Sequence, residues 1–497
     1  MELRHDAPWT LEQVSAQLRD PQPLTLADAT EAHIQHCRAY LEARMARSSD
    51  PIYGINTGFG DLHNKQVAAE DMAQLQVNLV RSHACGAGER VDPELVRLML
   101  LLKAIGLCQG HSGVQVGTVK QLLAFFNTGI SPVVYTQGSL GASGDLAPLA
   151  HLTLGLMGEG EVWYNGRRMS AASALEATGL QPIVLGAKEG LALLNGTQFM
   201  SAYATHILLR AARLADWADV LAALSLEAFD GRPEPFSDEV HAVRPHAGQR
   251  HVAARMRKLL EGSARIARAK AHVQDPYSFR CVPQVHGASR DALSHARQVV
   301  ETEINAVTDN PTIFPEQDRI ISAGNFHGQP LALVLDYAAI ALAEFGSISE
   351  RRVYKLISGQ RGLPPFLTPN PGLNSGFMIP QYTAASVVSR NKGLCTPASV
   401  DTIDSSNGQE DHVSMGANAA VKCKQVIDHL EILLGIEAVV AAQAFELGGT
   451  TPTSSKLQSV VATLRETIPA VTNDVILEPL LSAGKRFVSE TPPPAVD

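Results

Sequence analysis

The chain has 497 residues, 45% of them hydrophobic and 18% charged, with a formal net charge of −9. This is enough apolar material for two or three packed units or one large elongated fold. The sequence has no basic block, which argues against nucleic acid as a partner, because phosphate binding needs clustered Lys and Arg. The six cysteines show no CxxC spacing, which favours reduced thiols in the cytoplasm over a disulfide framework or a zinc site.

Neither the N-terminus nor the interior predicts a membrane segment. The N-terminal MELRHDAPWTLEQ has no apolar stretch of the kind that signal peptides carry. The longest apolar run, LALVLDYAAIALAEFG, is interrupted by Asp336 and Glu344, so no run reaches the length of a membrane span. We therefore expect a soluble, cytoplasmic protein with no membrane partner.

The first 195 residues predict a mixture of helices and short strands. Asp92 and Pro93 suit the N-cap and the first position of a helix that follows them. Strand-like runs occupy 131–137 and 161–169, and the turn Asn165-Gly166 predicts that the second run is a hairpin.

Beyond residue 195 helical periodicity dominates, because apolar residues recur every three or four positions. The predicted long helices are 201–229, 290–307, 327–358 and 412–446, separated by one strand-like run at 312–322 and by loops rich in Pro and Gly at 231–249 and 359–377. The predicted fold class is mainly α, with a smaller mixed α/β region at 1–195, a long central helical bundle at 196–488 and a flexible tail at 489–497.

Common cofactor and metal motifs are missing from the sequence. It contains no GxxxxGK[ST] phosphate loop, no GxSxG elbow and no HExxH pair. Glu410, Asp411 and His412 are adjacent, and adjacent side chains on a helix would point in different directions, so we expect no metal there.

The stretch GSLGASGDLAPL at 138–149 places Ala142-Ser143-Gly144 in a glycine-rich turn. Because Gly144 has no Cβ, its nitrogen can approach the Ala142 carbonyl carbon and close a five-membered ring. Loss of water from the ring and loss of the Ser143 hydroxyl would leave a methylidene electrophile, a function that no ordinary side chain supplies. The alternative is a plain turn in which Asp145 caps the next helix. These residues alone favour the plain turn.

Eight motifs in order along most of the chain change that balance. They are YGINTGFG (53–60), LQVNLVRSHACGAGE (75–89), GSLGASGDLAPLAHL (138–152), LLNGTQF (193–199), VQDPYSFRCVPQVHGA (273–288), TDNPTIF (308–314), SAGNFHGQP (322–330) and GQEDHVSMG (408–416). The series resembles the aromatic amino acid ammonia-lyase family, and most closely its histidine-specific members. The resemblance implies a fumarase/aspartase-like helical architecture and a homotetramer with shared active sites. It also implies a 4-methylidene-imidazol-5-one (MIO) group built from Ala142, Ser143 and Gly144, with no pyridoxal phosphate and no metal.

The resemblance also implies roles for individual residues. Tyr53 would remove the β-proton of the substrate, and its pKa, ordinarily about 10, would have to be lowered for this at neutral pH. Asn195 would hydrogen-bond the prosthetic ring, and Tyr277 would assist catalysis. Arg280 would bind the substrate carboxylate as a two-pronged fork. Two further residues, Gln274 and Phe326, would line the same pocket.

His83 and Glu410 bear on substrate choice, and Glu410 is expected to act in catalysis as well. Both match the histidine-specific pattern, because a carboxylate can accept a hydrogen bond from an imidazole but would be buried unpaired against a benzene ring. The expected reaction is L-histidine to trans-urocanate and ammonia. Arg390 and Gly408 depart from the family pattern near the expected substrate side.

Three alternatives remain at this point. A tyrosine or phenylalanine lyase, or a 2,3-aminomutase, would use the same prosthetic group. A fumarase-type lyase would need no electrophile, but its GSSxMPxKxN loop is missing from the sequence. A helical-bundle protein whose tripeptide never cyclises would leave the matching motifs as coincidence.

Overall fold

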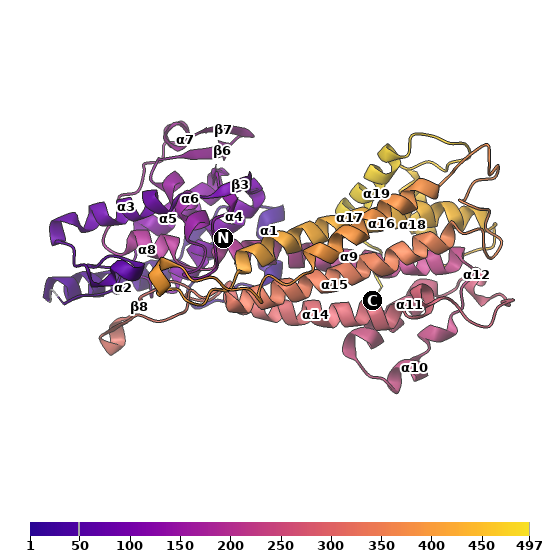
Figure 1. Cartoon of the computed structure of the whole chain (residues 1–497), viewed down its shortest axis with the longest axis horizontal. Coiled ribbons are helices and arrows are strands. Elements are labelled where there is room, and N and C mark those ends of the chain that lie inside the picture. Colours follow the sequence, from indigo (N-terminus) through magenta and orange to yellow (C-terminus); the bar gives the residue numbers. More distant parts are fainter. Residues whose placement is uncertain (48–49, 497) are drawn as a thin grey trace. The chain divides into compact units, whose positions relative to one another are not determined.

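The structure, a computed structural model, describes residues 1–47 and 50–496. It is mainly helical with a few short strands, which confirms the predicted fold class (Figure 1). The chain divides into two compact units, which are described separately. Unit 1 contains Met1–His206, Arg297–Asp336 and Pro397–Val421, and unit 2 contains Ile207–Ala296, Tyr337–Thr396 and Lys422–Asp497.

The predicted division into 1–195 and 196–488 differs from these units, because unit 1 also takes in two later segments. A reading along the chain groups residues that follow one another, so it does not detect segments that return to an earlier unit. The four predicted long helices are confirmed as α9 (Gln198–Ala228), α14 (Val282–Glu303), α15 (Gln329–Leu356) and α17 (Gly416–Leu447).

Unit 1 is built around α4 (Pro93–Cys108). As predicted, Asp92 is its N-cap, and the Asp92 carboxylate accepts the Glu94 N–H at 2.9 Å. Every residue from Leu98 to Cys108 is buried, and a helix that is apolar all round belongs in a core. It packs against α2 (Asp28–Arg47) and α5 (Val116–Thr128). The other α-helices that lie wholly in unit 1 are α1 (Leu11–Arg19), α3 (Met72–His83), α6 (Leu146–Leu156), α7 (Ala171–Thr178) and α8 (Glu189–Leu194).

The strands of unit 1 are short. The predicted hairpin is confirmed, because β6 (Glu161–Tyr164) pairs with β7 (Arg167–Ser170) across Asn165 and Gly166, whose φ angles are 50° and 70°. The predicted run 312–322 is also a hairpin rather than one strand, since it turns at Asp318 (φ 48°). The remaining strands are β1 (Glu2–Leu3), β2 (Thr25–Leu26), β3 (Ala87–Arg90), β4 (Ser131–Pro132), β5 (Tyr135–Gln137), β8 (Thr312–Phe314) and β9 (Arg319–Ile321).

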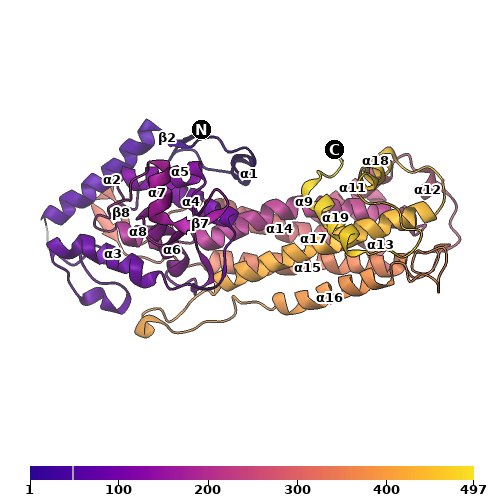
Figure 2. The same ribbon diagram turned by 90° about the horizontal axis from the view of Figure 1, so that it is seen from above.

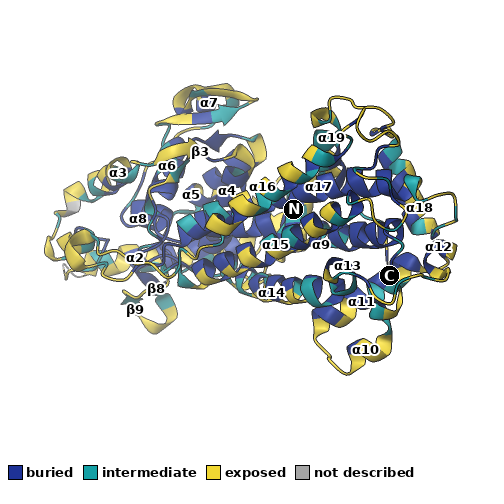
Figure 3. Cartoon of the chain, turned by 45° about the vertical axis from the view of Figure 1, so that its right-hand side comes forward, coloured by how far each residue is buried: buried dark blue, intermediate teal, exposed yellow. Residues whose placement is uncertain are grey.

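Unit 2 is a helical bundle. The parts of α9, α14, α15 and α17 that belong to it run side by side (Figures 1 and 2). Figure 3 shows α9 and α17 mainly buried, and small residues such as Ala438, Ala441 and Ala442 on α17 allow close packing. The shorter helices of unit 2 are α10 (Asp238–Ala242), α11 (Ala247–Leu260), α12 (Ala264–Ala267), α13 (Tyr277–Arg280), α16 (Met378–Leu394), α18 (Ser455–Arg465) and α19 (Glu478–Glu490).

The apolar helix α15 and the predicted flexible tail both pack against other parts of the protein. Among the described residues α15 is long and apolar enough to cross a membrane, but 67% of its most apolar window is buried, as in a core helix. The predicted flexible tail, 489–497, starts inside α19, and its described part packs against unit 2. Val496 is buried, and the Thr491 carbonyl accepts the Trp217 indole N–H at 3.0 Å.

A buried ion pair ties two helices of unit 2 together. Arg352 and Glu437 have fully buried side chains and form a two-pronged contact, with Nε–Oε1 at 2.6 Å and Nη2–Oε2 at 2.8 Å. Ser225 also donates to Glu437 Oε1 at 2.8 Å. This geometry satisfies the carboxylate that burial would otherwise penalise.

Replacing Arg352 by Met should therefore destabilise the protein strongly, because Glu437 would be left buried without its cation. We expect a loss of about 3 to 5 kcal/mol in the free energy of unfolding, measured by urea denaturation. The double variant Arg352→Met/Glu437→Leu removes both charges and should recover most of the loss. A double variant as unstable as the single one would contradict this account.

Candidate active site

The loop at 138–145 is pinned by a backbone contact between two glycines. Gly144 has a φ of +72° and forms a parallel bridge with Gly196. A Cβ on Gly144 would lie 2.1 Å from the Gly196 carbonyl oxygen, and the next amide, Asp145 N–H, donates to that same oxygen at 2.7 Å. Only glycine fits this position, both in backbone angle and in space.

The other side of the loop is held by the segment before α17. Ser414 Oγ donates to the Gly141 carbonyl at 2.8 Å, and the Met415 N–H donates to the Leu140 carbonyl at 2.8 Å. Ala142 packs in a small apolar cluster with Val413 and Met415. The tripeptide is thus fixed from two directions before any chemistry occurs.

Asp145 does not cap α6, contrary to the plain-turn interpretation. It stands at the N-cap position, but its carboxylate makes no capping bond to the helix. It accepts instead from the Met200 N–H at 3.0 Å and from Ser139 Oγ at 2.9 Å. Burial raises the pKa of Asp145 to about 7. The carboxyl therefore links the loop to the start of α9.

Asn195 contacts the tripeptide directly. Its side-chain Nδ2 donates to the Ser143 carbonyl oxygen at 2.6 Å. Its own backbone carbonyl accepts from Lys103 Nζ at 2.7 Å. Burial lowers the pKa of Lys103, which is 2% exposed on the apolar helix α4, to about 7. Lys103 thus fixes the main chain of Asn195, and the side chain of Asn195 in turn bonds Ser143.

Glu410 accepts a hydrogen bond from the Ser143 hydroxyl. Ser143 Oγ donates to Glu410 Oε1 at 2.7 Å, and Ser405 Oγ donates to Glu410 Oε2 at 2.9 Å. Residues 410–412 are not helical, so the helical premise used against a metal at Glu410, Asp411 and His412 was wrong. The described residues nevertheless contain no group of three His, Cys, Asp or Glu side chains arranged to hold a metal ion.

Two adjoining cavities meet at Ser143, with volumes of about 470 and about 570 Å³. Both are lined by residues of unit 1. These include four site residues that were predicted from the sequence, namely Tyr53, Ser143, Phe326 and Glu410. His83 and Asn195 line the first cavity, and Ala142 lines the second. Residues from six distant motifs therefore converge on one site.

Tyr53 and His83 are both partly desolvated. The Tyr53 hydroxyl accepts the Gly60 N–H at 3.3 Å, yet burial raises the pKa of Tyr53, and the charge of Glu410 adds to this. Action as a base at neutral pH would need a lowered pKa, and the surroundings of Tyr53 within one chain raise it instead. Burial lowers the pKa of His83, whose Nδ1 lies 2.8 Å from the Leu79 carbonyl. As the donor in that bond, Nδ1 carries the proton and leaves Nε2 as an acceptor.

Gln274, Tyr277 and Arg280 lie in unit 2 and line neither cavity. They form a cluster of their own at the surface. Arg280 Nη1 donates to Gln274 Oε1 at 2.7 Å, and the guanidinium lies 4.7 Å from the centre of the Tyr277 ring. Tyr277 is 70% exposed. Arg280 Nε has no hydrogen-bond partner among the described residues.

Comparison with known proteins places this site in a family. Residues 9–466 match the aromatic amino acid lyase family. The chain belongs to the aromatic amino acid lyases. It is 49% identical over 481 residues to a histidine ammonia-lyase of Symbiobacterium thermophilum, covering 96% of this chain and 95% of that protein.

Solved structures agree with this membership. The histidine ammonia-lyase of Trypanosoma cruzi superposes with a TM-score of 0.91 at 39% identity, covering 98% of this chain and 93% of that one. The phenylalanine aminomutase of Pantoea agglomerans superposes with a TM-score of 0.94 at 31% identity, covering 99% of both chains. The fold is thus common to aromatic lyases and aminomutases.

Several buried charged groups near the loop at 138–145 were not predicted from the sequence. Lys103 and Asp145 are buried, and Lys188 and Asp309 form a buried ion pair at 2.5 Å. One signal was available for Lys103, because a single lysine inside the apolar run LMLLLKAIGLC breaks the pattern of a core helix. Asp145 gave no such signal, since Asp before a helix is commonly an N-cap.

The raised pKa of Asp145 should appear as pH-dependent stability. A carboxyl whose pKa is about 7 when folded and 3.8 when exposed binds its proton more tightly in the folded state. Its contribution is complete below the exposed value and is lost as the pH rises through the folded value. Between pH 4.5 and 6.5 the wild type should therefore lose more of its thermal midpoint than Asp145→Asn does, measured by scanning calorimetry. Parallel pH profiles for the two proteins would rule this out.

Proposed function

We propose that the chain is a histidine ammonia-lyase, which converts L-histidine to trans-urocanate and ammonia in the cytoplasm. The observation that carries the proposal is the position of Ser143. It lies on the cavity wall between Asn195, which donates to its carbonyl, and Glu410, which accepts from its hydroxyl. The names of the relatives support the same activity.

The residues around the tripeptide fit an MIO group formed from the chain itself. Ring closure joins the Gly144 nitrogen to the Ala142 carbonyl carbon and releases one water, and loss of the Ser143 hydroxyl with its α-proton releases a second. Position 144 has no room for a side chain, because a Cβ there would collide with Gly196, and glycine satisfies this condition. The Asn195 N–H already contacts the Ser143 carbonyl, which becomes the ring carbonyl. No metal or pyridoxal phosphate is required.

The group supplies an electrophilic carbon that captures the substrate amine, and the chain's residues supply the rest. Asn195 withdraws electron density from the ring carbonyl through its hydrogen bond. Phe326 lines both cavities together with Ser143. The wall is largely apolar on the side of Leu79 and Leu194, which excludes water from the reacting atoms.

Tyr53 is the proposed base for the β-proton. It lines both cavities with Ser143, so it can reach a substrate held there. Because burial raises its pKa in the single chain, this role requires positive charge near the hydroxyl in the working enzyme. An Arg280 from another copy of the chain would supply that charge.

Glu410 and His83 are the proposed selectors for histidine. Glu410 faces the cavity as a carboxylate, and His83 offers Nε2 because Nδ1 donates to Leu79. A protonated substrate imidazole carries two N–H donors and can donate one to each, whereas a phenyl ring would leave both acceptors unpaired at a cost of several kcal/mol.

We further propose a homotetramer in which unit 2 of one copy completes the unit 1 cavity of another. Gln274 and Tyr277 are exposed beside the half-buried Arg280, and a guanidinium suits a substrate carboxylate because it can bond both oxygens. Unit 2 also exposes large apolar side chains on α15 and α16, a feature that marks contact surfaces. They are Tyr337, Ile340, Tyr354, Ile379 and Tyr382.

An aminomutase is the second candidate, because the Pantoea structure superposes so closely. The two functions differ in product, since a mutase returns the amine to the β-carbon. Chromatography of the products from L-histidine separates urocanate from a β-amino acid. Urocanate alone supports the lyase, and a β-amino acid as main product overturns it.

Replacing Glu410 by Gln should lower kcat/KM for L-histidine about 100-fold, because the amide is a weaker partner for the imidazole. The ultraviolet absorbance of urocanate gives the rate, and the intact mass reports whether the MIO group has formed. Asp404→Asn is the matched control, since Asp404 is an exposed carboxylate in the same loop that lines neither cavity. Equal rates for Glu410→Gln and the wild type would contradict the proposed selection.

Site sharing predicts complementation between two inactive variants. Tyr53→Phe damages unit 1, and Arg280→Met damages unit 2. Chains that carry one lesion each, expressed together, should regain roughly one quarter of wild-type activity if two copies build each site and mix at random. Hybrids as inactive as the separate variants would show that each site is built from one chain.

A further inference from the structure

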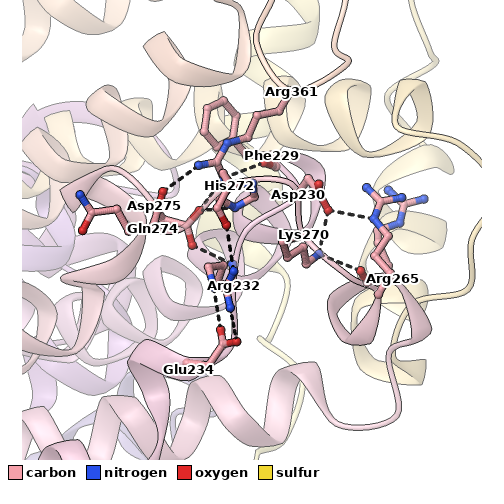
Figure 4. A network of polar contacts seen from close by, with 11 residues as sticks. Phe229, Asp230, Arg232, Glu234, Arg265, Lys270, His272, Gln274, Asp275 and Arg361 are labelled. Carbon is pink, nitrogen blue, oxygen red and sulfur yellow. Dashed lines mark hydrogen bonds and ion pairs between the residues drawn. The ribbon is translucent and has the colours of Figure 1, made fainter.

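The segment that carries Gln274, Tyr277 and Arg280 is anchored by a buried carboxylate. Asp275, 3% exposed, directly follows Gln274 and lies two residues before Tyr277. It accepts the Arg232 N–H at 2.7 Å, and its Oδ1 lies 3.2 Å from His272 Nε2. The third contact is an ion pair with Arg361, which comes from a loop far along the chain (Figure 4).

Arg361 grips the segment at more than one point. Besides Asp275, its guanidinium donates to the Gln274 carbonyl at 3.1 Å and to the Phe229 carbonyl at 3.3 Å. It also lies 4.6 Å from the centre of the Phe229 ring (Figure 4). On that ring stacks Phe279, at 4.7 Å between centroids and 4° between planes. Phe279 immediately precedes Arg280, so the grip reaches both ends of the segment.

The backbone of Arg361 adds an independent observation. Its φ is +53°, in the left-handed region that a non-glycine residue enters only at a cost of about 1 kcal/mol or more. Its side chain is only 16% exposed. A long cationic side chain held in a strained backbone and away from water indicates that its position is fixed by the contacts it makes.

We propose that Arg361, acting through Asp275 and Phe229, is a positioning residue for the Gln274–Arg280 segment. It fixes Tyr277 and the Arg280 guanidinium in the arrangement that a substrate carboxylate requires. The proposal rests on the proposed function, because it assumes that this segment completes the lyase site. Arg361 contacts neither cavity, so its effect on turnover passes entirely through the segment.

Two substitutions separate the parts of this role. Arg361→Lys keeps the positive charge but cannot bond Asp275 and two carbonyls together, because a lysine lacks the planar fork. Arg361→Met keeps the apolar stem and removes every polar contact. The matched control is Arg465→Lys. Arg465 is also 16% exposed in unit 2, pairs with Glu446 at 2.8 Å and donates to the Ile468 carbonyl, but touches nothing in the segment.

Hydrogen exchange of the segment tests the positioning without any assay of activity. Three backbone N–H groups in and just after α13 report on the segment. Those of Phe279 and Arg280 donate to the Pro276 carbonyl, and that of Cys281 donates to the Tyr277 carbonyl, at 2.9 to 3.1 Å. Both Arg361 variants should exchange these amides at least ten times faster than the wild type, and Arg465→Lys should not. Exchange as slow as in the control would overturn the proposal whether or not the chain is a lyase.

Turnover then tests the consequence. In both Arg361 variants the mass deficit of the MIO group should remain complete, because unit 1 builds it. We expect kcat/KM for L-histidine to fall about 10-fold in Arg361→Lys and about 100-fold in Arg361→Met, with a raised KM, since an ångström of misplacement can cost that much. Rates that match Arg465→Lys at an equal loss of thermal midpoint would reduce Arg361 to a structural role. A wild type without histidine turnover would refute the function, while the exchange result would still decide the positioning.

Discussion

The contact between the backbones of Gly144 and Gly196 is the constraint on which the rest of the site depends. It brings the loop at 138–145 against the chain at Asn195 so closely that no side chain fits between them. Because the Gly196 carbonyl also accepts the Asp145 N–H, the tripeptide is held at its C-terminal end. Asn195 then has one place to donate its amide, the Ser143 carbonyl. The conformation of the loop is thus fixed largely by main-chain packing, which suits the cyclisation that we propose.

Buried charge supports this contact from beneath. Lys103 bonds the Asn195 carbonyl, and Asp145 bonds the first turn of α9. Charged groups of this kind cost free energy to bury unless they are hydrogen-bonded. Here their hydrogen bonds fix the two segments that pack together, the loop at 138–145 and the chain at Asn195. Unit 2 uses the same means at Asp275 and Arg361, where a buried carboxylate and a partly buried guanidinium hold a segment that exposes Tyr277.

The sequence predicted the long helices, the hairpin at Asn165-Gly166 and the family, because periodicity, turn chemistry and motif order are local or sequential signals. It also brought forward the residues of unit 1 that the structure gathers around Ser143. It did not predict the composition of the two units, since segments that return to an earlier unit leave no local trace. The direction of the Tyr53 pKa shift could not be predicted either, because desolvation depends on what packs around the ring. The roles of Gln274, Tyr277 and Arg280 stay predictions.

In the proposed enzyme Ala142, Ser143 and Gly144 become one electrophilic ring. The most direct test is peptide mass mapping of the purified chain beside Ser143→Ala and Gly144→Ala. The account predicts that the wild-type peptide containing 142–144 is lighter than its sequence by two water molecules. Gly144→Ala should keep its full sequence mass, because the added Cβ displaces the loop from Gly196, and Ser143→Ala cannot lose the second water. A wild-type peptide of unmodified mass in protein that deaminates L-histidine would contradict the account.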